Sequence, residues 1–423
     1  WILNGQKQWI TNGGIADVFI VFAKIDGEKF SAFIVERGTP GFSSGAEERK
    51  MGIRGSSTTA LVFEDARIPV ENLLGEAGKG HRIAFNILNI GRLKLGVGSV
   101  AGVRHVLSLA AAYAKERKAF GRPIAELGLI REKLGRMAAL VFAGEAMSYR
   151  TTGAIDDRVA RSGHPRSSPA HDQDVIAAVE EYAVEASILK VWGTEALFWA
   201  ADEAVQTYGG YGFVEDYPVE RLYRDNRVNR IFEGTNEINR MLVPGTLLKR
   251  AMKGQFPLLE VADATRRAIA SGDLPRAPSG PLGREARLAE LTKHLFVEAT
   301  RAAVEAHGPA LADQQEVLGA LADVAIEAYA IDSAVARARQ LVAGGGPNPL
   351  AEALVGLYAY EAHERAHQRA RRAVLAAVRD PEAARPVLAG LRTLLDDAPW
   401  DPLGAQEAVV AAVLEQGRYP FSP

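Results

Sequence analysis

The chain has 423 residues, of which 48% are hydrophobic and 24% are charged, so it can build a sizeable core and global disorder is not expected. Its formal net charge of −2 gives no global attraction for nucleic acid, and we expect no nucleic-acid partner. The absence of cysteine excludes disulfides, thiolate catalysis and cysteine-ligated metal centres. No apolar run approaches the roughly 20 residues that span a bilayer.

Residues 1–72 are predicted to form antiparallel β-structure. Asn4-Gly5 and Asp26-Gly27 are hairpin signals, because both pairs suit positive φ in a tight turn. Strands are predicted at 18–25, 30–35 and 58–63. The chain begins without Met, in the middle of a predicted hairpin, so we expect a natural N-terminal portion to precede it.

After residue 72 the apolar spacing changes from a period of 2 to one of 3.6, which predicts helices. Four of them, forming a four-helix-bundle domain over 73–255, are predicted at 78–115, 128–152, 174–207 and 235–253. Glycine and proline within 161–169 predict a surface loop between the second and third helices.

The segment 256–284 contains several Gly and Pro residues and is predicted to be a linker. Residues 285–423, rich in Ala, Leu, Glu and Arg at helical spacing, are predicted to form an additional helical domain. The predicted fold class is therefore α+β, mainly α, with a partial antiparallel β-domain followed by two helical domains.

Several short motifs follow one another over residues 1 to about 250. They are Trp9-Ile10-Thr11-Asn12-Gly13, Met51-Gly52-Ile53-Arg54-Gly55-Ser56, Arg117-Lys118-Ala119-Phe120-Gly121, Gln206-Thr207-Tyr208-Gly209-Gly210-Tyr211-Gly212-Phe213, Arg224-Asp225 and Phe232-Glu233-Gly234-Thr235-Asn236-Glu237. Their order and spacing resemble the acyl-CoA dehydrogenase family. The helical extension after residue 264 makes the chain look most like the very-long-chain branch. The resemblance implies that a further helical domain and the first β-strands precede residue 1, so we expect the fragment alone to bind FAD poorly.

The resemblance implies that Glu233 is the catalytic base, which abstracts the α-proton of an acyl thioester. Phe232 lowers the local polarity, and burial makes a carboxylate a stronger base. Gly234 allows the substrate to approach the backbone closely. Some family members carry the base on the helix around Gly91, which here has no side chain. Outside this motif series, a lone glutamate in a loop is an ordinary solvated charge.

By resemblance, Asn89 and Arg92 contact the CoA portion of the substrate together with Gly234, although a plain polar helix face remains the alternative. The residues that match flavin contacts of the family are Trp9, Thr11, Arg117, Phe120, Gln206, Gly209, Gly210, Thr235 and Glu237. Thr235 is equally suited to be an N-cap. Ala119 departs from the family pattern, which often has Thr or Gln there, so one polar flavin contact is missing.

The implied reaction is FAD-dependent α,β-dehydrogenation of a fatty acyl-CoA to the trans-2-enoyl-CoA, with electrons passed to an electron-transfer flavoprotein. The implied assembly is a homodimer or homotetramer whose FAD site is shared between subunits. The implied location is the cytoplasm of a bacterium or the mitochondrial matrix of a eukaryote. For the extension, a peripheral membrane contact and the replacement of a tetramer contact both stay open. An acyl-CoA oxidase and a non-catalytic scaffold of the same fold are the alternatives.

A different class of enzyme is indicated by His363-Glu364-Arg365-Ala366-His367, which has the HExxH spacing of zinc hydrolases. On a helix this spacing puts His363 and His367 on one face. The segment continues as a basic stretch, which disfavours a cation, and no third histidine follows. We therefore expect no metal site and keep the zinc hydrolase as a remote alternative.

Overall fold

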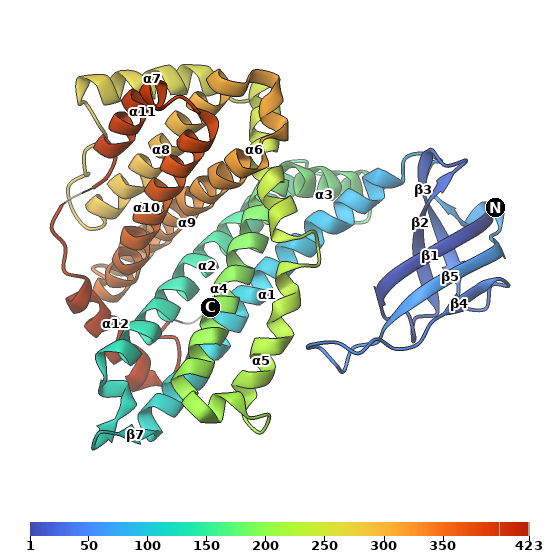
Figure 1. The fold of residues 1–423 in the computed structure, drawn as a ribbon, viewed down its shortest axis with the longest axis horizontal. Helices are drawn as coiled ribbons and strands as arrows, with labels where there is room; N and C mark the ends of the chain where they lie inside the picture. The colour runs from blue at the N-terminus through green and yellow to red at the C-terminus, as the bar shows by residue number, and fades with distance from the viewer. Residues whose placement is uncertain (397, 422–423) are drawn as a thin grey trace. The chain divides into compact units, whose positions relative to one another are not determined.

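The computed structural model of the protein describes residues 1–396 and 398–421 and divides into two compact units. Unit 1 comprises residues 1–91 and 224–228, and unit 2 comprises residues 92–223 and the chain from 229 onward. Unit 1 is largely antiparallel β-structure and unit 2 is helical (Figure 1). The predicted class, α+β with helices predominating, is confirmed.

Unit 1 contains two three-stranded antiparallel sheets. The first has the strand order β1-β5-β4, with bounds Ile2–Thr11, Thr58–Arg67 and Phe42–Ser44. The second has the order β2-β3-β6, with bounds Val18–Ile25, Lys29–Glu36 and Leu73–Leu74. Buried side chains from both sheets, including Phe33, Val35 and Phe63, form one shared core.

One of the two predicted hairpins is present and the other is wrong. Asp26 and Gly27 have φ of 53° and 76° and connect β2 to β3, as predicted. Asn4 and Gly5 instead lie inside β1, which pairs with β5 and has a register irregularity at this point. The side chain of Asn4 donates a hydrogen bond to Asp65 on β5, so tertiary pairing uses the pair as a bulge rather than a turn.

The predicted helices 78–115, 128–152 and 235–253 appear as α1 (Gly80–Glu116), α2 (Gly128–Ala160) and α6 (Asn236–Met252). The predicted helix 174–207 is two helices, α3 (Pro169–Glu181) and α4 (Ala183–Tyr208). They break at Tyr182, whose φ and ψ of −96° and 23° leave the helical region. α5 (Pro218–Asn226) and the small β7–β8 pair (Lys118–Ala119 and Arg122–Pro123) complete this part.

Among the described residues after 256, the structure has six α-helices: α7 (Leu258–Ser271), α8 (Gly283–His307), α9 (Gln315–Gly345), α10 (Pro349–Ala377), α11 (Pro381–Thr393) and α12 (Pro402–Gln416). α7 lies in the segment predicted to be a linker, because its buried Ala262 and Thr265 give it a face to pack. Within that segment, residues 256–257 and 272–282 lie outside the helices.

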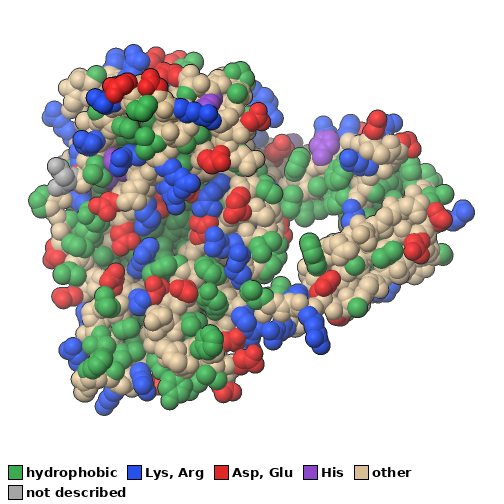
Figure 2. Space-filling model, viewed as in Figure 1, with side chains coloured by type: hydrophobic (Ala, Val, Ile, Leu, Met, Phe, Trp, Pro, Cys, Tyr) green, Lys and Arg blue, Asp and Glu red, His purple; other side chains and the backbone are tan. Residues whose placement is uncertain are grey.

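The predicted helical parts 73–255 and 285–423 both contribute side chains to one large core cluster, and a second cluster of buried residues lies mainly among α8, α9, α10 and α11. α2, α4, α9 and α10 run alongside one another in Figure 1, and their buried side chains form one cluster. The indole of Trp192 on α4 donates a 2.8 Å hydrogen bond to the hydroxyl of Tyr358 on α10. Basic and acidic side chains are interspersed over the visible face of this helical unit (Figure 2).

By length and composition, α1 is the one helix within the described residues that is able to cross a membrane. Buried core helices pass the same test, and 44% of its most apolar window is buried inside the protein. This helix is therefore weak support for a membrane span.

Candidate active site

The loop that carries Glu233 is held in a strained backbone conformation. Glu233 and Gly234 have φ of 58° and 77°, which is the left-handed region. A non-glycine residue there persists only where its surroundings fix it. Directly after them, the Thr235 hydroxyl accepts a hydrogen bond from the amide of Ile238 at 3.3 Å. Thr235 is thus the N-cap of α6, which fixes where the loop ends.

Polar side chains from two other helices and from α6 bind the carbonyl oxygens of this loop. Arg92 on α1 donates from Nε to the Glu233 oxygen at 3.3 Å, and Lys190 on α4 donates to the Gly234 oxygen at 2.8 Å. Asn239 donates to the oxygens of Gly234 and Thr235 at 2.9 and 3.0 Å. The loop backbone is therefore fixed from several sides.

Glycine is required at position 234 for two reasons. Its φ is unfavourable for other residues, and an added Cβ would lie 3.2 Å from Asn239 Nδ2. That contact is tighter than side chains normally tolerate, so a larger residue would displace the donor that holds the loop.

The carboxylate of Glu233 is left available by this arrangement. Its Oε2 atom is buried and has no hydrogen-bond partner among the described residues. Buried polar atoms without partners are uncommon and often mark functional groups. Burial lowers the pKa of the Arg92 guanidinium, and the negative charge of Glu233 opposes that shift. The site thus combines an unpartnered carboxylate oxygen with a nearby cation.

Asn89 and Arg92 lie one turn apart on α1, and both are only 5% exposed. Each takes part in interactions with its surroundings, so neither belongs to a solvated helix face. Gly91 lies between them and offers no group that accepts a proton. Glu233 remains the candidate base.

Four of the predicted flavin residues line a cavity of about 660 Å³ in unit 2: Arg117, Phe120, Gly209 and Gly210. Gly209 has a φ of 61° and ends α4, which glycine permits at no steric cost. Gln206 is exposed on the last turn of α4 and is absent from the lining. The structure therefore brings together one part of the predicted set.

Phe120 is unusual within this lining, because its side chain is 91% exposed and its φ is 54°. A strained, exposed aromatic side chain has no role in the core of its own chain. The Arg117 guanidinium lies 5.7 Å from the centre of the Tyr211 ring, at the rim of the same cavity. An arginine, small glycines and an exposed ring are groups that fit a phosphate and a flat ring system, so these residues fit part of FAD.

The remaining predicted flavin residues are not among those that line this cavity. Trp9 and Thr11 are on β1 in unit 1; Trp9 is 72% exposed with a φ of 54°, so it is not a core residue. Glu237 is exposed in the first turn of α6. Hydrogen bonding to its own backbone, and then to Thr235, lowers the pKa of the Glu237 carboxyl against a desolvation effect.

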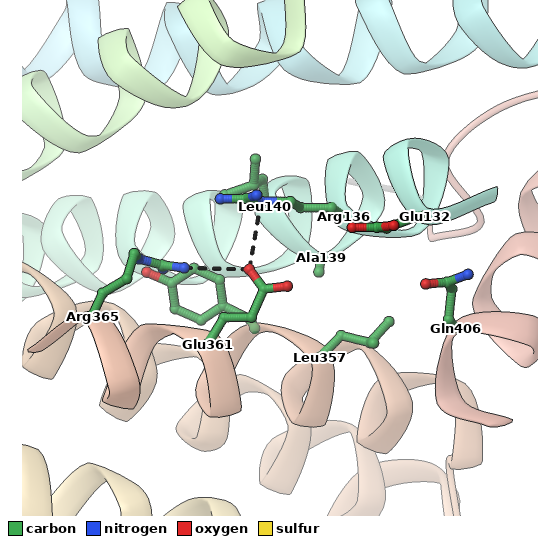
Figure 3. Close-up of a pocket in the computed structure, with 9 residues that line it drawn as sticks. Glu132, Arg136, Ala139, Leu140, Leu357, Glu361, Arg365 and Gln406 are labelled. Carbon is green, nitrogen blue, oxygen red and sulfur yellow. Dashed lines mark hydrogen bonds and ion pairs between the residues drawn. The ribbon is translucent and has the colours of Figure 1, made fainter. Parts of the chain in front are cut away.

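A much smaller cavity, of about 30 Å³, lies between α2, α10 and α12 (Figure 3). Glu361 on α10 forms ion pairs there with Arg136 at 3.5 Å and Arg365 at 3.4 Å. The volume admits a water molecule but no organic substrate. This cavity is a packing feature between helices and is not a candidate site.

The zinc-hydrolase alternative is contradicted by the surroundings of its histidines. His363 and His367 are buried, and their Nε2 atoms lie 3.0 and 3.1 Å from the carbonyl oxygens of Leu394 and Leu391. Carbonyl oxygens only accept, so these nitrogens carry protons and are not ligands. Burial lowers the pKa of His363 to about 4, and the Leu394 carbonyl opposes this.

Lys190 was not predicted from the sequence, although its side chain is fully buried and contacts the Glu233 loop. The signal was present: it is a single lysine within the apolar run Ile188-Leu189-Lys190-Val191. A charged side chain is rarely fully buried unless it is paired. Its partners lie about 45 residues away in sequence, so only the fold identifies them.

Three family models match the chain. They describe the acyl-CoA dehydrogenase middle domain at residues 1–66 and two acyl-CoA dehydrogenase C-terminal domains at 78–248 and 291–393. A probable acyl-CoA dehydrogenase of Bacillus subtilis is 42% identical, and the match covers 99% of this chain and 70% of that protein. The human very long-chain specific mitochondrial acyl-CoA dehydrogenase is 34% identical, and the match covers 82% of this chain and 54% of that protein.

Among solved structures, an acyl-CoA dehydrogenase complexed with FAD from Bacillus anthracis superposes with a TM-score of 0.94 at 43% identity. The match covers 99% of this chain and 71% of that one. The chain thus spans between about half and seven tenths of these relatives. Identity at this level over nearly the whole chain, together with the three matching domains, shows that the chain belongs to the acyl-CoA dehydrogenase family.

Proposed function

We propose that the protein catalyses α,β-dehydrogenation of a fatty acyl-CoA to the trans-2-enoyl-CoA, with Glu233 as the base that removes the α-proton. The observation that carries this proposal is the buried Glu233 Oε2, which has no partner among the described residues and lies on a loop fixed by several donors. A base in this setting typically contributes ~10²–10⁴-fold to a rate.

The residues around Glu233 favour proton transfer at one defined position. Arg92 and Asn239 hold the Glu233 carbonyl and the following backbone, so the carboxylate is presented from a rigid loop. The backbone N–H of Glu233 is proposed to bind the thioester carbonyl, which stabilises the negative charge that develops there. Asn89 and Arg92 are proposed to contact the CoA portion.

FAD, when bound, supplies the acceptor for the hydrogen that leaves the β-carbon. Arg117, Phe120, Gly209 and Gly210 are proposed to hold one part of it, because they line a single cavity whose chemistry fits a nucleotide. The other proposed contacts are Trp9, Thr11, Gln206, Thr235 and Glu237. A second copy of the chain is proposed to share the FAD site, and an electron-transfer flavoprotein is proposed to take the electrons.

The experiment that tests this function uses the full-length protein loaded with FAD and a series of straight-chain acyl-CoA esters, mixed without oxygen. We expect the flavin absorbance to bleach, with the rate identifying the preferred chain length. An oxygen electrode then separates two outcomes: slow reoxidation by oxygen supports a dehydrogenase, and rapid substrate-dependent oxygen uptake supports an oxidase. No bleaching with any ester contradicts both and favours a scaffold.

A further inference from the structure

Lys190 is the most deeply buried charged group beside the Glu233 loop. Its side chain has 0% exposure, and its ammonium donates to the Gly234 carbonyl at 2.8 Å and to Asn236 Oδ1 at 2.7 Å. These acceptors bracket Thr235, the N-cap of α6. Moving an ammonium from water into a protein interior is costly unless its hydrogen bonds are replaced. The position of Lys190 is therefore tied to this loop.

We propose that Lys190 is a positioning residue that holds Glu233 in its strained backbone conformation by joining the Gly234 carbonyl to the start of α6. This inference rests on the function proposed above, because it assigns Lys190 a role in that reaction. Lys190 acts through the backbone and does not touch the reacting atoms.

The geometry explains why a lysine is suited to this task. A non-glycine residue at positive φ, such as Glu233, is strained relative to a relaxed conformation, so its neighbours must fix it. An ammonium donates in several directions at once and reaches two acceptors that lie on different parts of the loop. Asn239 also binds the Gly234 carbonyl, but it belongs to α6 itself. Lys190 is the donor that links this carbonyl to α4.

The charges around Lys190 keep its ammonium protonated at neutral pH. Burial lowers its pKa to about 8, and the carboxylates of Glu237, Glu195 and Glu233 oppose that shift, whereas Arg92 adds to it. Asn236 is held in turn by Glu195, because its amide donates to the Glu195 carboxylate at 3.0 Å. The side chains of Lys190 and Asn236 are therefore both held in place by hydrogen bonds, unlike a mobile lysine on the surface.

The test compares two variants. Lys190→Met has a side chain of similar length but no hydrogen-bond donor, whereas Lys190→Gln keeps an N–H donor on a shorter side chain. We expect Lys190→Met to lower the rate of flavin reduction by roughly 10–100-fold, because a small displacement of a catalytic group has effects of that size. KM and FAD content should change little. The rate of flavin reduction in Lys190→Gln should lie between those of Lys190→Met and the wild type. If Lys190→Met does not fold, Lys190→Gln is compared with the wild type instead.

Hydrogen exchange provides a readout that does not depend on turnover. Amides of residues 232–236 should exchange at least about tenfold faster in Lys190→Met than in the wild type, because the opening of the loop no longer breaks two hydrogen bonds. If the protein reduces no acyl-CoA, this measurement still tests whether Lys190 holds the loop. Failure of the proposed function and failure of this inference are therefore distinguishable.

A matched control is Lys293→Met, which removes a half-buried lysine bound to Glu290 and Asp332, away from the Glu233 loop. We expect it to leave flavin reduction and exchange at 232–236 unchanged. The inference is overturned if Lys190→Met reduces flavin at the wild-type rate with unchanged exchange. It is also overturned if Lys293→Met reproduces both effects, because the loss then reflects general destabilisation.

Discussion

The loop around Glu233 and the turn of α10 that carries His363 and His367 both match catalytic sequence patterns, yet the structure treats their polar atoms in opposite ways. In the loop, backbone carbonyls receive the hydrogen bonds, and the carboxylate oxygen Oε2 is left without a partner among the described residues. In α10, the imidazole Nε2 atoms are themselves bound to carbonyls, so they are used by the fold.

A catalytic sequence pattern and a structural one differ in which polar atoms their surroundings leave without a hydrogen-bond partner. A residue that stabilises the fold has its side-chain donors and acceptors satisfied. A residue that carries out chemistry has a fixed backbone and an unsatisfied functional group, because the substrate is its partner. Glu233 meets the second description and His363 meets the first.

The largest effect is expected when the glutamate of each pattern, Glu233 in the loop and Glu364 in α10, is replaced by glutamine. Glu233→Gln removes the proposed base and should lower the rate of flavin reduction by ~10²–10⁴-fold, since an amide does not take the α-proton. FAD content and thermal stability should stay close to the wild type. The measurement is anaerobic single-turnover bleaching by an acyl-CoA.

Glu364→Gln is the matched control, because Glu364 would be the base of a zinc hydrolase and is exposed on α10. It should leave flavin reduction unchanged. A wild-type rate for Glu233→Gln removes Glu233 from its role, whereas an equal loss in the two variants would remove the distinction between the two regions.

We expect acid to destabilise the fold through His363, which is buried and neutral in α10. His363 has a pKa near 4 in the folded state against 6.5 for the free side chain, so the unfolded state binds more protons between these values. The contribution of neutral His363 to the free energy of unfolding is therefore fully present above pH 6.5 and is lost as the pH falls toward 4. The difference corresponds to roughly 3 kcal/mol in the free energy of unfolding. His367, whose pKa burial also lowers, acts in the same direction.

Urea unfolding of the wild type and of His363→Gln at pH values between 4 and 7 checks this prediction. The variant should be less stable at pH 7 and should lose less of its stability on acidification. Equal pH dependence in the two proteins would show that His363 does not carry the effect.

Helices with a clear apolar period are the features that the sequence predicts best. The 3.6-residue apolar period predicted α1, α2 and α6 to within a few residues except at the end of α2, because apolar residues recur at helical spacing along these segments. The break at Tyr182 has no glycine or proline to mark it. α7 was not predicted, because the Gly and Pro residues that follow it led us to interpret the whole segment 256–284 as a linker.

Within the site, the motif series indicated Glu233, Gly234 and Arg92, since local sequence carries their pattern. The role of Lys190 depends on acceptors from a distant segment, which no local pattern reveals. The packing of the last helices against the core was also not predicted. It depends on contacts between distant segments, such as that of Trp192 on α4 with Tyr358 on α10. Long-range contacts thus account for most of what was not predicted.

The smallest effect is expected from a residue of the C-terminal helices that is linked to the Glu233 loop only through other side chains. Asp323 on α9 accepts from Arg240 Nε at 2.7 Å, and Arg240 binds the Glu195 carboxylate through two contacts of 2.7 and 2.8 Å. Glu195 in turn accepts from Asn236. Asp323→Asn keeps an acceptor but removes its charge, so we expect a loss of about 1 kcal/mol in stability and a decrease of a few-fold in flavin reduction.

Asp332→Asn is the matched control, because Asp332 is also on α9 and pairs with two cations, Arg150 at 2.6 Å and Lys293 at 2.7 Å. Its loss of stability should be similar, but its partners do not contact Glu195 or Asn236. If only Asp323→Asn slows flavin reduction, α9 contributes to the positioning of Glu233 and the last helices belong to the catalytic unit. If both variants lose stability and neither changes the rate, the contribution of α9 is confined to packing, and the support of Glu233 ends at Arg240.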